Sequence, residues 1–155
     1  MNDEFFMSKA LELARQAAED GEVPVGAIVV KDGEIVGKGR NRRENGKNAL
    51  AHAELEAIDE ACKRLGGWRL WQCELYVTLE PCPMCTGAII NSRLRRLVYG
   101  ASDKKAGSCG SVINLFDLPY NHKPESVGGV MEEECVAILS DFFKALREQK
   151  NKGNK

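Results

Sequence analysis

Apolar side chains recur along the chain with helical spacing in some segments and strand-like patterns in others. Residues 5–19 have helical spacing, which predicts a helix with an inward face of Phe5, Phe6, Ala10, Leu13, Ala14 and Ala17. Residues 23–30 form an apolar, β-branched run that indicates a buried strand. Residues 35–40 form the return strand, after a hairpin turn with Asp32-Gly33 at its tip.

Helices and strands alternate along the rest of the chain. Helices are predicted at residues 51–65, 83–92 and 131–149, strands at 74–79, 96–100 and 126–130, and irregular or short helical structure at 109–118. Gly66-Gly67 ends the first of these helices, and Pro83 takes the favoured first position of the second. This order predicts an α/β fold with a mixed five-stranded sheet. Its first two strands are antiparallel and its later strands are parallel.

The length and composition fit one globular unit. We expect a single domain over residues 1–150 and a short disordered tail over residues 151–155. The hydrophobic share of 43% and the charged share of 29% are ordinary for a soluble protein. No apolar run reaches the roughly 20 residues that cross a bilayer, and the acidic start Met1–Glu4 does not resemble a signal peptide. We therefore expect a cytoplasmic protein with no membrane partner.

The charges and the scattered cysteines permit more than one interpretation. The net charge is −1, yet basic residues gather at 38–47, at 93–96 and from residue 144 onward. Such clusters either bind a phosphate backbone or are solvated surface charge. Four single cysteines are predicted to be buried or idle thiols: Cys62, Cys73, Cys109 and Cys135.

A split motif carries the candidate chemistry. Ala51-His52-Ala53-Glu54 gives H-x-E, and after 26 further residues Pro81-Cys82-Pro83-Met84-Cys85 gives P-C-x-x-C. This is the known signature of the zinc-dependent nucleobase deaminases. His52, Cys82 and Cys85 supply three zinc ligands and leave the fourth position for a water, whose pKa zinc lowers to about 7. Glu54 is then free to carry protons.

Both halves of the motif fall at predicted helix starts, where unpaired amides and the helix dipole favour thiolates. Three other interpretations compete with the catalytic site. In the first, Cys82 and Cys85 form a redox pair. In the second, the zinc is structural and has Cys73, Cys109 or His122 as its fourth ligand. In the third, the residues occur together by chance. The redox interpretation gives His52 and Glu54 no role.

The chain resembles bacterial tRNA-specific adenosine deaminases of the TadA type, within the cytidine deaminase-like superfamily. The resemblance covers residues 22–147 and includes motifs beyond the zinc ligands. These are Glu22-Val23-Pro24-Val25-Gly26-Ala27, Asn41-Arg42, Leu75-Tyr76-Val77-Thr78-Leu79-Glu80, Tyr99-Gly100-Ala101, Gly110-Ser111, Asn121-His122 and Asp141-Phe142-Phe143. The zinc motif alone indicates only the superfamily.

The resemblance implies a three-layer α/β/α sandwich, one Zn²⁺ per subunit and a homodimer whose subunits build the site jointly. It implies hydrolysis of adenosine to inosine at the wobble position of a tRNA anticodon stem-loop. Asn41 would then bond the base or ribose and Val25 would pack on the purine. Family positions near the flanking anticodon nucleotides correspond in this chain to Asp103, Lys105, Asn121 and His122. Family positions on the helix that meets the stem-loop correspond to Phe142, Phe143 and Arg147.

An anticodon loop fits this chemistry because its bases are already unstacked and cost little to extrude. Two other functions stay open. One is a deaminase of a free nucleobase or nucleoside of the guanine, adenosine or cytidine type. The sequence Cys-Pro-Met-Cys also occurs in guanine deaminases, Lys123 stands where arginine is frequent, and Ser102 precedes Asp103 in a loop that tunes substrate choice. The other is a non-catalytic zinc module that binds RNA or a protein partner.

Overall fold

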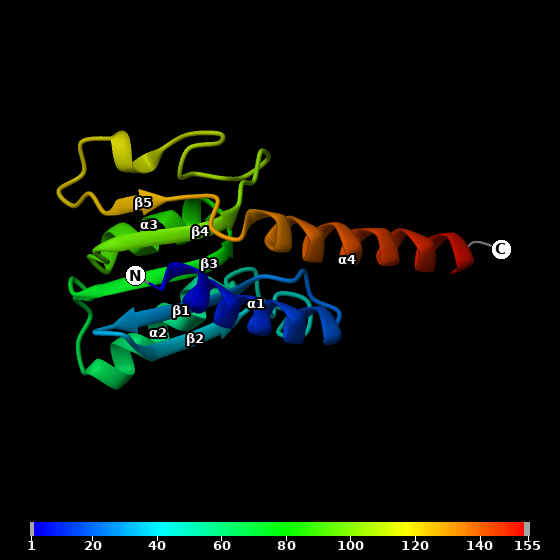
Figure 1. The fold of residues 1–155 in the computed structure, drawn as a ribbon, viewed down its shortest axis with the longest axis horizontal. Coiled ribbons are helices and arrows are strands. Elements are labelled where there is room, and N and C mark those ends of the chain that lie inside the picture. Colours follow the sequence, from blue (N-terminus) through cyan, green and yellow to red (C-terminus); the bar gives the residue numbers. More distant parts are fainter. Residues whose placement is uncertain (1, 154–155) are drawn as a thin grey trace.

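The computed structural model describes residues 2–153, which form one five-stranded sheet with helices on both faces (Figure 1). The strands are β1 (Gly26–Lys31), β2 (Glu34–Arg40), β3 (Cys73–Leu79), β4 (Arg96–Ala101) and β5 (Glu125–Val127). The helices are α1 (Asp3–Glu19), α2 (Ala53–Leu65), α3 (Pro83–Asn91) and α4 (Glu132–Gly153), with a short 3₁₀ turn η1 (Leu115–Asp117). The predicted α/β/α arrangement is confirmed.

The strands are ordered β2-β1-β3-β4-β5. Strand β1 is antiparallel to both β2 and β3, whereas β3, β4 and β5 run parallel. Asp32 and Gly33 both have positive φ, 51° and 79°, as the type I′ hairpin turn between β1 and β2 requires. Because β3 and β4 are parallel, their carboxyl ends meet at one edge of the sheet. Loops at such an edge are where open α/β sheets place their ligands.

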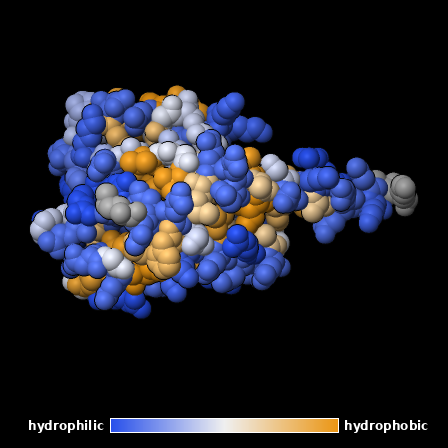
Figure 2. Space-filling model, viewed as in Figure 1, coloured by the Kyte–Doolittle hydropathy of each residue, from blue (hydrophilic) through white to orange (hydrophobic). Residues whose placement is uncertain are grey.

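Two apolar cores lie on the two faces of the sheet. Helices α2 and α3 pack on one face, around Ala57, Leu75 and Ile89. Helix α1 and the base of α4 pack on the other, around Met7, Leu11 and Cys135. The apolar side chains at the base of α4 are visible where this helix leaves the body, whereas its projecting half is mainly hydrophilic (Figure 2).

The predicted inward face of α1 is partly wrong. Met7 and Leu11 are fully buried, whereas Phe5 is 53% exposed and Leu13 is only half-buried. Ala10, Ala14 and Ala17 are buried as expected. Helix α1 packs on the sheet through the face that carries Met7, Leu11 and these small alanines, which leaves Phe5 mostly exposed.

Helix α4 is longer than predicted. It continues through residue 153, so residues 151–153 of the expected disordered tail are helical, and residues 154–155 lie outside the described residues. Lysine, glutamate and glutamine are good helix formers. Basic side chains near the C-terminus of the helix interact favourably with the negative end of the helix dipole. None of the helices in residues 2–153 combines the length and apolar character needed to span a membrane.

Candidate metal centre and substrate pocket

The first turns of α2 and α3 bring the split motif together. His52 is the N-cap residue of α2, and Cys82 is the N-cap residue of α3 with Pro83 directly after it. The Nδ1 atom of His52 lies 3.5 Å from Sγ of Cys85 and 3.7 Å from Sγ of Cys82. The ligand atoms of all three residues lie within 4.8 Å of one another. The convergence expected from the sequence is therefore present.

The three donors have the chemistry of a zinc site. Hydrogen bonding from the Cys85 thiol, together with His52, lowers the pKa of Cys82 to about 4 despite its burial. The contact with Cys82 raises the pKa of His52. The bond to Cys82 and burial raise the pKa of Cys85. Two sulfurs and an imidazole nitrogen at this spacing fit zinc, which binds tetrahedrally to such ligands.

The structural-zinc interpretation requires a fourth ligand, and the described residues 2–153 place only three in the cluster. Cys109 instead contacts the hydroxyl of Thr86 at 3.4 Å. His122 contacts the carbonyl oxygen of Leu94 at 2.7 Å through Nε2. Cys73 begins β3, at the opposite end of that strand from the site. A set of three ligands is the arrangement of catalytic zinc sites.

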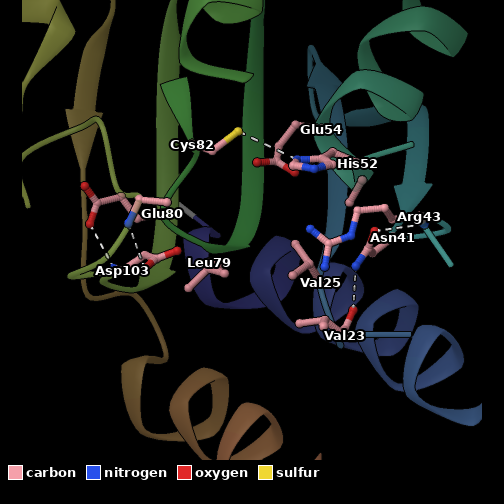
Figure 3. A pocket seen from close by; sticks show the side chains of 12 residues that line it. Val23, Val25, Asn41, Arg43, His52, Glu54, Leu79, Glu80, Cys82 and Asp103 are labelled. Carbon is pink, nitrogen blue, oxygen red and sulfur yellow. Dashed lines mark hydrogen bonds between the residues drawn. The ribbon is translucent and has the colours of Figure 1, made fainter. Parts of the chain in front are cut away.

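A cavity of about 190 Å³ opens beside this cluster (Figure 3). Glu54 lines it from the first turn of α2, two residues after His52, and is only 4% exposed. Burial raises the pKa of the Glu54 carboxyl to about 7. A carboxyl group with such a pKa both accepts and donates protons near neutral pH.

Three of the predicted substrate residues also line this cavity: Val25, Asn41 and Asp103. Val25 is buried and offers an apolar wall. The Asn41 side chain is held in place because its amide nitrogen donates to the carbonyl oxygen of Val23 at 3.3 Å. Its Oδ1 accepts the backbone N–H of Arg43 at 3.2 Å. The structure thus fixes the position of Asn41, and its contact with substrate stays a prediction.

Other predicted substrate residues do not reach the cavity within one chain. Lys105 is exposed and follows Asp103, whose Oδ1 accepts its backbone N–H at 3.0 Å. His122 is tied to Leu94, which precedes the amino end of β4, whereas the cavity lies at the carboxyl ends of the strands. Asn121 is exposed beside His122. Their predicted contacts with flanking nucleotides therefore require a second subunit or an extended substrate.

The aromatic pair on α4 lies near a second, shallower hollow. Phe142 and Phe143 pack edge to face, with ring centroids 5.4 Å apart. Phe143 and Arg147 line the hollow together with Ser102, the neighbour of Asp103 in the main cavity. Phe143 is 41% exposed. Adjacent residues 102 and 103 thus line the α4 hollow and the main cavity, respectively.

The sequence interpretation missed two charged residues that line the cavity, Arg43 and Glu80. Arg43 stands out in the sequence only as part of the basic cluster at 38–47, although it lies two residues after Asn41. Glu80 stands out in the sequence only as the last residue of the Leu75–Glu80 motif. Burial opposes the ionisation of Glu80, but hydrogen bonds from Ser111 and from backbone amides lower its pKa. The other lining residues outside the predicted set are the apolar Val23, Ala53, Leu79 and Ala106.

The basic cluster at residues 93–96 is largely structural. Arg96 is buried and pairs with Asp3 at 2.8 Å and with Glu74 at 3.4 Å. Arg95 also pairs with Glu74. Arg93 donates to the carbonyl oxygen of Ile90 at 2.8 Å, within the turn after α3. These partners leave this cluster little capacity for phosphates.

Comparison with known proteins places the chain among deaminases. The family model of the MafB19-like deaminases matches residues 1–147. The chain is 50% identical to the tRNA-specific adenosine deaminase of Bacillus subtilis (strain 168) over 154 residues, which cover 99% of this chain and 96% of that protein.

Solved structures agree with this placement. The fold matches a tRNA:A34 deaminase studied for A-to-I editing at the wobble position of transfer RNA, with a TM-score of 0.84 and 45% identity over 87% of this chain and 99% of that chain. It also matches guanine deaminase from Nitrosomonas europaea, with a TM-score of 0.75 and 27% identity over 90% of this chain and 83% of that chain.

Proposed function

The chain belongs to the tRNA-specific adenosine deaminase family, and we propose that it hydrolyses adenosine to inosine at the wobble position of a tRNA anticodon. The observation that carries this proposal is the convergence of His52, Cys82 and Cys85 beside the buried Glu54 in one cavity. The closely similar chains act on tRNA by name, whereas the guanine deaminase is only 27% identical.

In the proposed reaction, water replaces the exocyclic amine at C6 of adenosine, and ammonia leaves. Zinc held by His52, Cys82 and Cys85 would lower the pKa of water and supply a nucleophile at neutral pH. Glu54 takes one proton from the attacking water and passes it to a ring nitrogen, then carries the remaining hydroxyl proton to the leaving amine, so that ammonia departs and the carbonyl of inosine forms. Its burial keeps bulk water away from these transfers. Asn41 bonds the base or ribose, and Val25 packs against the purine ring.

The wider substrate surface follows from the same proposal. Asp103 and Lys105 stand near the flanking anticodon nucleotides, and Phe142, Phe143 and Arg147 meet the stem-loop along α4. Basic residues on the projecting half of α4 support this, since a phosphate backbone requires cations whereas a neutral nucleoside does not. Asn121 and His122 reach the substrate of a partner subunit in the proposed homodimer. A tRNA substrate places the enzyme in the cytoplasm.

A free nucleobase or nucleoside is the alternative substrate. The observation that favours it is the fold shared with guanine deaminase, combined with a cavity that one base alone can enter. In that case the zinc ligands and Glu54 keep their roles, and the α4 residues have only structural ones.

The test measures ammonia released by the zinc-loaded protein from each substrate, together with inosine formed within the stem-loop or from free adenosine. Substrates are an anticodon stem-loop with adenosine at the wobble position, the same stem-loop with guanosine there, and free adenosine, guanine and cytidine. We expect turnover on the adenosine stem-loop alone, and turnover confined to a free base or nucleoside would establish the alternative.

The matched control is Glu54→Gln, which keeps the size of the side chain but cannot carry the proton. We expect turnover to fall by about 10²–10⁴-fold while the zinc content is unchanged. Zinc binding without turnover in both proteins, on every substrate, would indicate the non-catalytic module. Undiminished turnover by the variant would refute the role of Glu54.

A further inference from the structure

We propose that Glu80 is a positioning residue that fixes the loop of residues 103–111 and thereby one wall of the substrate cavity. Glu80 follows directly after β3 and precedes Pro81-Cys82. It is only 2% exposed, and it belongs to the cavity lining together with Asp103 and Ala106 of the 103–111 loop. Its carboxylate points toward this loop and not toward the zinc ligands (Figure 3).

The loop surrounds the carboxylate with hydrogen-bond donors. The Oε1 atom accepts the backbone N–H of Asp103 at 3.1 Å and the hydroxyl of Ser111. The Oε2 atom accepts the backbone N–H of Cys109 at 3.0 Å and that of Ser111 at 3.1 Å. Both ends of the loop and a point between them are thus tied to one buried side chain.

These donors replace the cation that a buried carboxylate would otherwise require. Within residues 2–153, no lysine, arginine or histidine forms an ion pair with Glu80. An ionised side chain removed from water is costly unless it is fully hydrogen-bonded. The loop therefore stabilises the charge of Glu80, and Glu80 in turn holds the loop in one conformation.

The packing at Gly107 supports the same conclusion. A Cβ atom at this position would overlap the carboxylate of Glu80 and the carbonyl oxygen of Asp103. The loop thus lies so close to Glu80 that only glycine fits. A turn within the loop keeps its first half compact, because Oδ1 of Asp103 accepts the backbone N–H of Ala106 at 3.2 Å.

The consequence concerns substrate alignment, so this inference rests on the proposed function. Asp103 and Ala106 line the same cavity as Glu54 and Asn41, and Asp103 lies on the opposite side from these two (Figure 3). A loop released from Glu80 would leave the zinc ligands in place but let the base shift relative to Glu54. A misplacement of about 1 Å costs roughly 10²-fold in rate.

The experiment compares the wild-type protein with Glu80→Gln, which preserves size but replaces one acceptor oxygen by a donor. The first measurement is backbone hydrogen exchange without substrate. We expect the amides of Asp103, Cys109 and Ser111 to lose protection while α2 and α3 keep theirs. We also expect unchanged zinc content, a higher KM and a lower kcat, with kcat/KM about 10²-fold lower on the stem-loop.

A second variant separates positioning from a general loss of stability. Asp3→Asn weakens the ion pair of Asp3 with the buried Arg96, far along the chain from the motif, and serves as a control for a loss of stability outside the site. We expect it to lower the melting temperature but to leave KM and kcat unchanged at 25 °C. Gly107→Ala, which presses the loop away from Glu80, should reproduce the kinetic defect of Glu80→Gln. The double variant should be no worse than the poorer single variant.

Native loop protection in Glu80→Gln, or a kinetic defect shared by Asp3→Asn, would overturn the proposal. Additive losses in the double variant would do so too, because they would show that Gly107 and Glu80 act separately. If the wild-type protein fails to deaminate any stem-loop, the proposed function fails, yet the exchange measurement still decides whether Glu80 holds the loop.

Discussion

Replacing Gly39 by alanine should displace the start of α2 and weaken the metal centre. Gly39 lies in β2 directly beneath the first turn of this helix. A Cβ atom there would lie 2.7 Å from the backbone nitrogen of Ala57 and 2.9 Å from Cβ of Glu56, and closer still to the carbonyl oxygen of Ala53. Ala53 stands between His52 and Glu54, so the clash acts on the residues that carry the chemistry.

The size of the displacement follows from these contacts. Non-bonded atoms pack best at about 3.5–4.0 Å, so the helix start must move by on the order of 1 Å. Zinc–ligand distances deviate from their ideal values by only about 0.2 Å, so a shift of this size disturbs the site. The overpacking itself costs about 1–3 kcal/mol of stability. We expect zinc affinity to fall about 10–100-fold and kcat/KM about 100-fold.

The assay combines urea unfolding, zinc competition with a chelator, and inosine formation at saturating zinc. Gly37→Ala is the matched control, because its Cβ would press on Ala57 and Ala61 in the middle of the same helix, farther from His52. It should lose similar stability but less zinc affinity. Gly67→Ala, which meets open space, should change neither. Wild-type zinc affinity and kcat/KM in Gly39→Ala, despite lowered stability, would refute the reasoning.

Two further predictions concern charged side chains. Hydrogen bonds from Arg96 hold the pKa of Asp3 below its usual 3.8. The pair therefore stabilises the folded protein above about pH 4, and this stabilisation disappears as the pH falls through the lowered pKa. Asp3→Asn should therefore lower the free energy of unfolding by about 2 kcal/mol at pH 7. Urea unfolding should show the difference from wild type disappearing below pH 4, and a difference independent of pH would contradict this. Arg43→Gln should raise KM for the stem-loop several-fold and reduce the salt slope of binding by about 1, without changing any turnover of free adenosine. An equal effect on both substrates would mean that Arg43 does not meet a phosphate.

Short-range patterns in the sequence determined most of the secondary structure and the reactive residues. The hairpin turn at Asp32-Gly33, the end of α2 at Gly66 and the start of α3 at Pro83 depend on local conformational preferences, so they were predictable. The zinc ligands were predictable for a similar reason. His52, Cys82 and Cys85 sit at fixed spacings within two segments, and few other chemistries use those residue types together.

Only the tertiary structure decided which residues meet across the fold. Periodicity shows that α1 has an apolar face, but the shape of the sheet selects Met7 and Leu11 over Phe5. The same limit hid Glu80, whose donors lie 23 to 31 residues later in the chain, and Arg43, whose place in the cavity depends on β1 and α2. A sequence records which side chains are available within a few residues of one another. Burial and hydrogen bonding across the sheet depend on the relative positions of distant segments, and these are fixed only when the two cores pack.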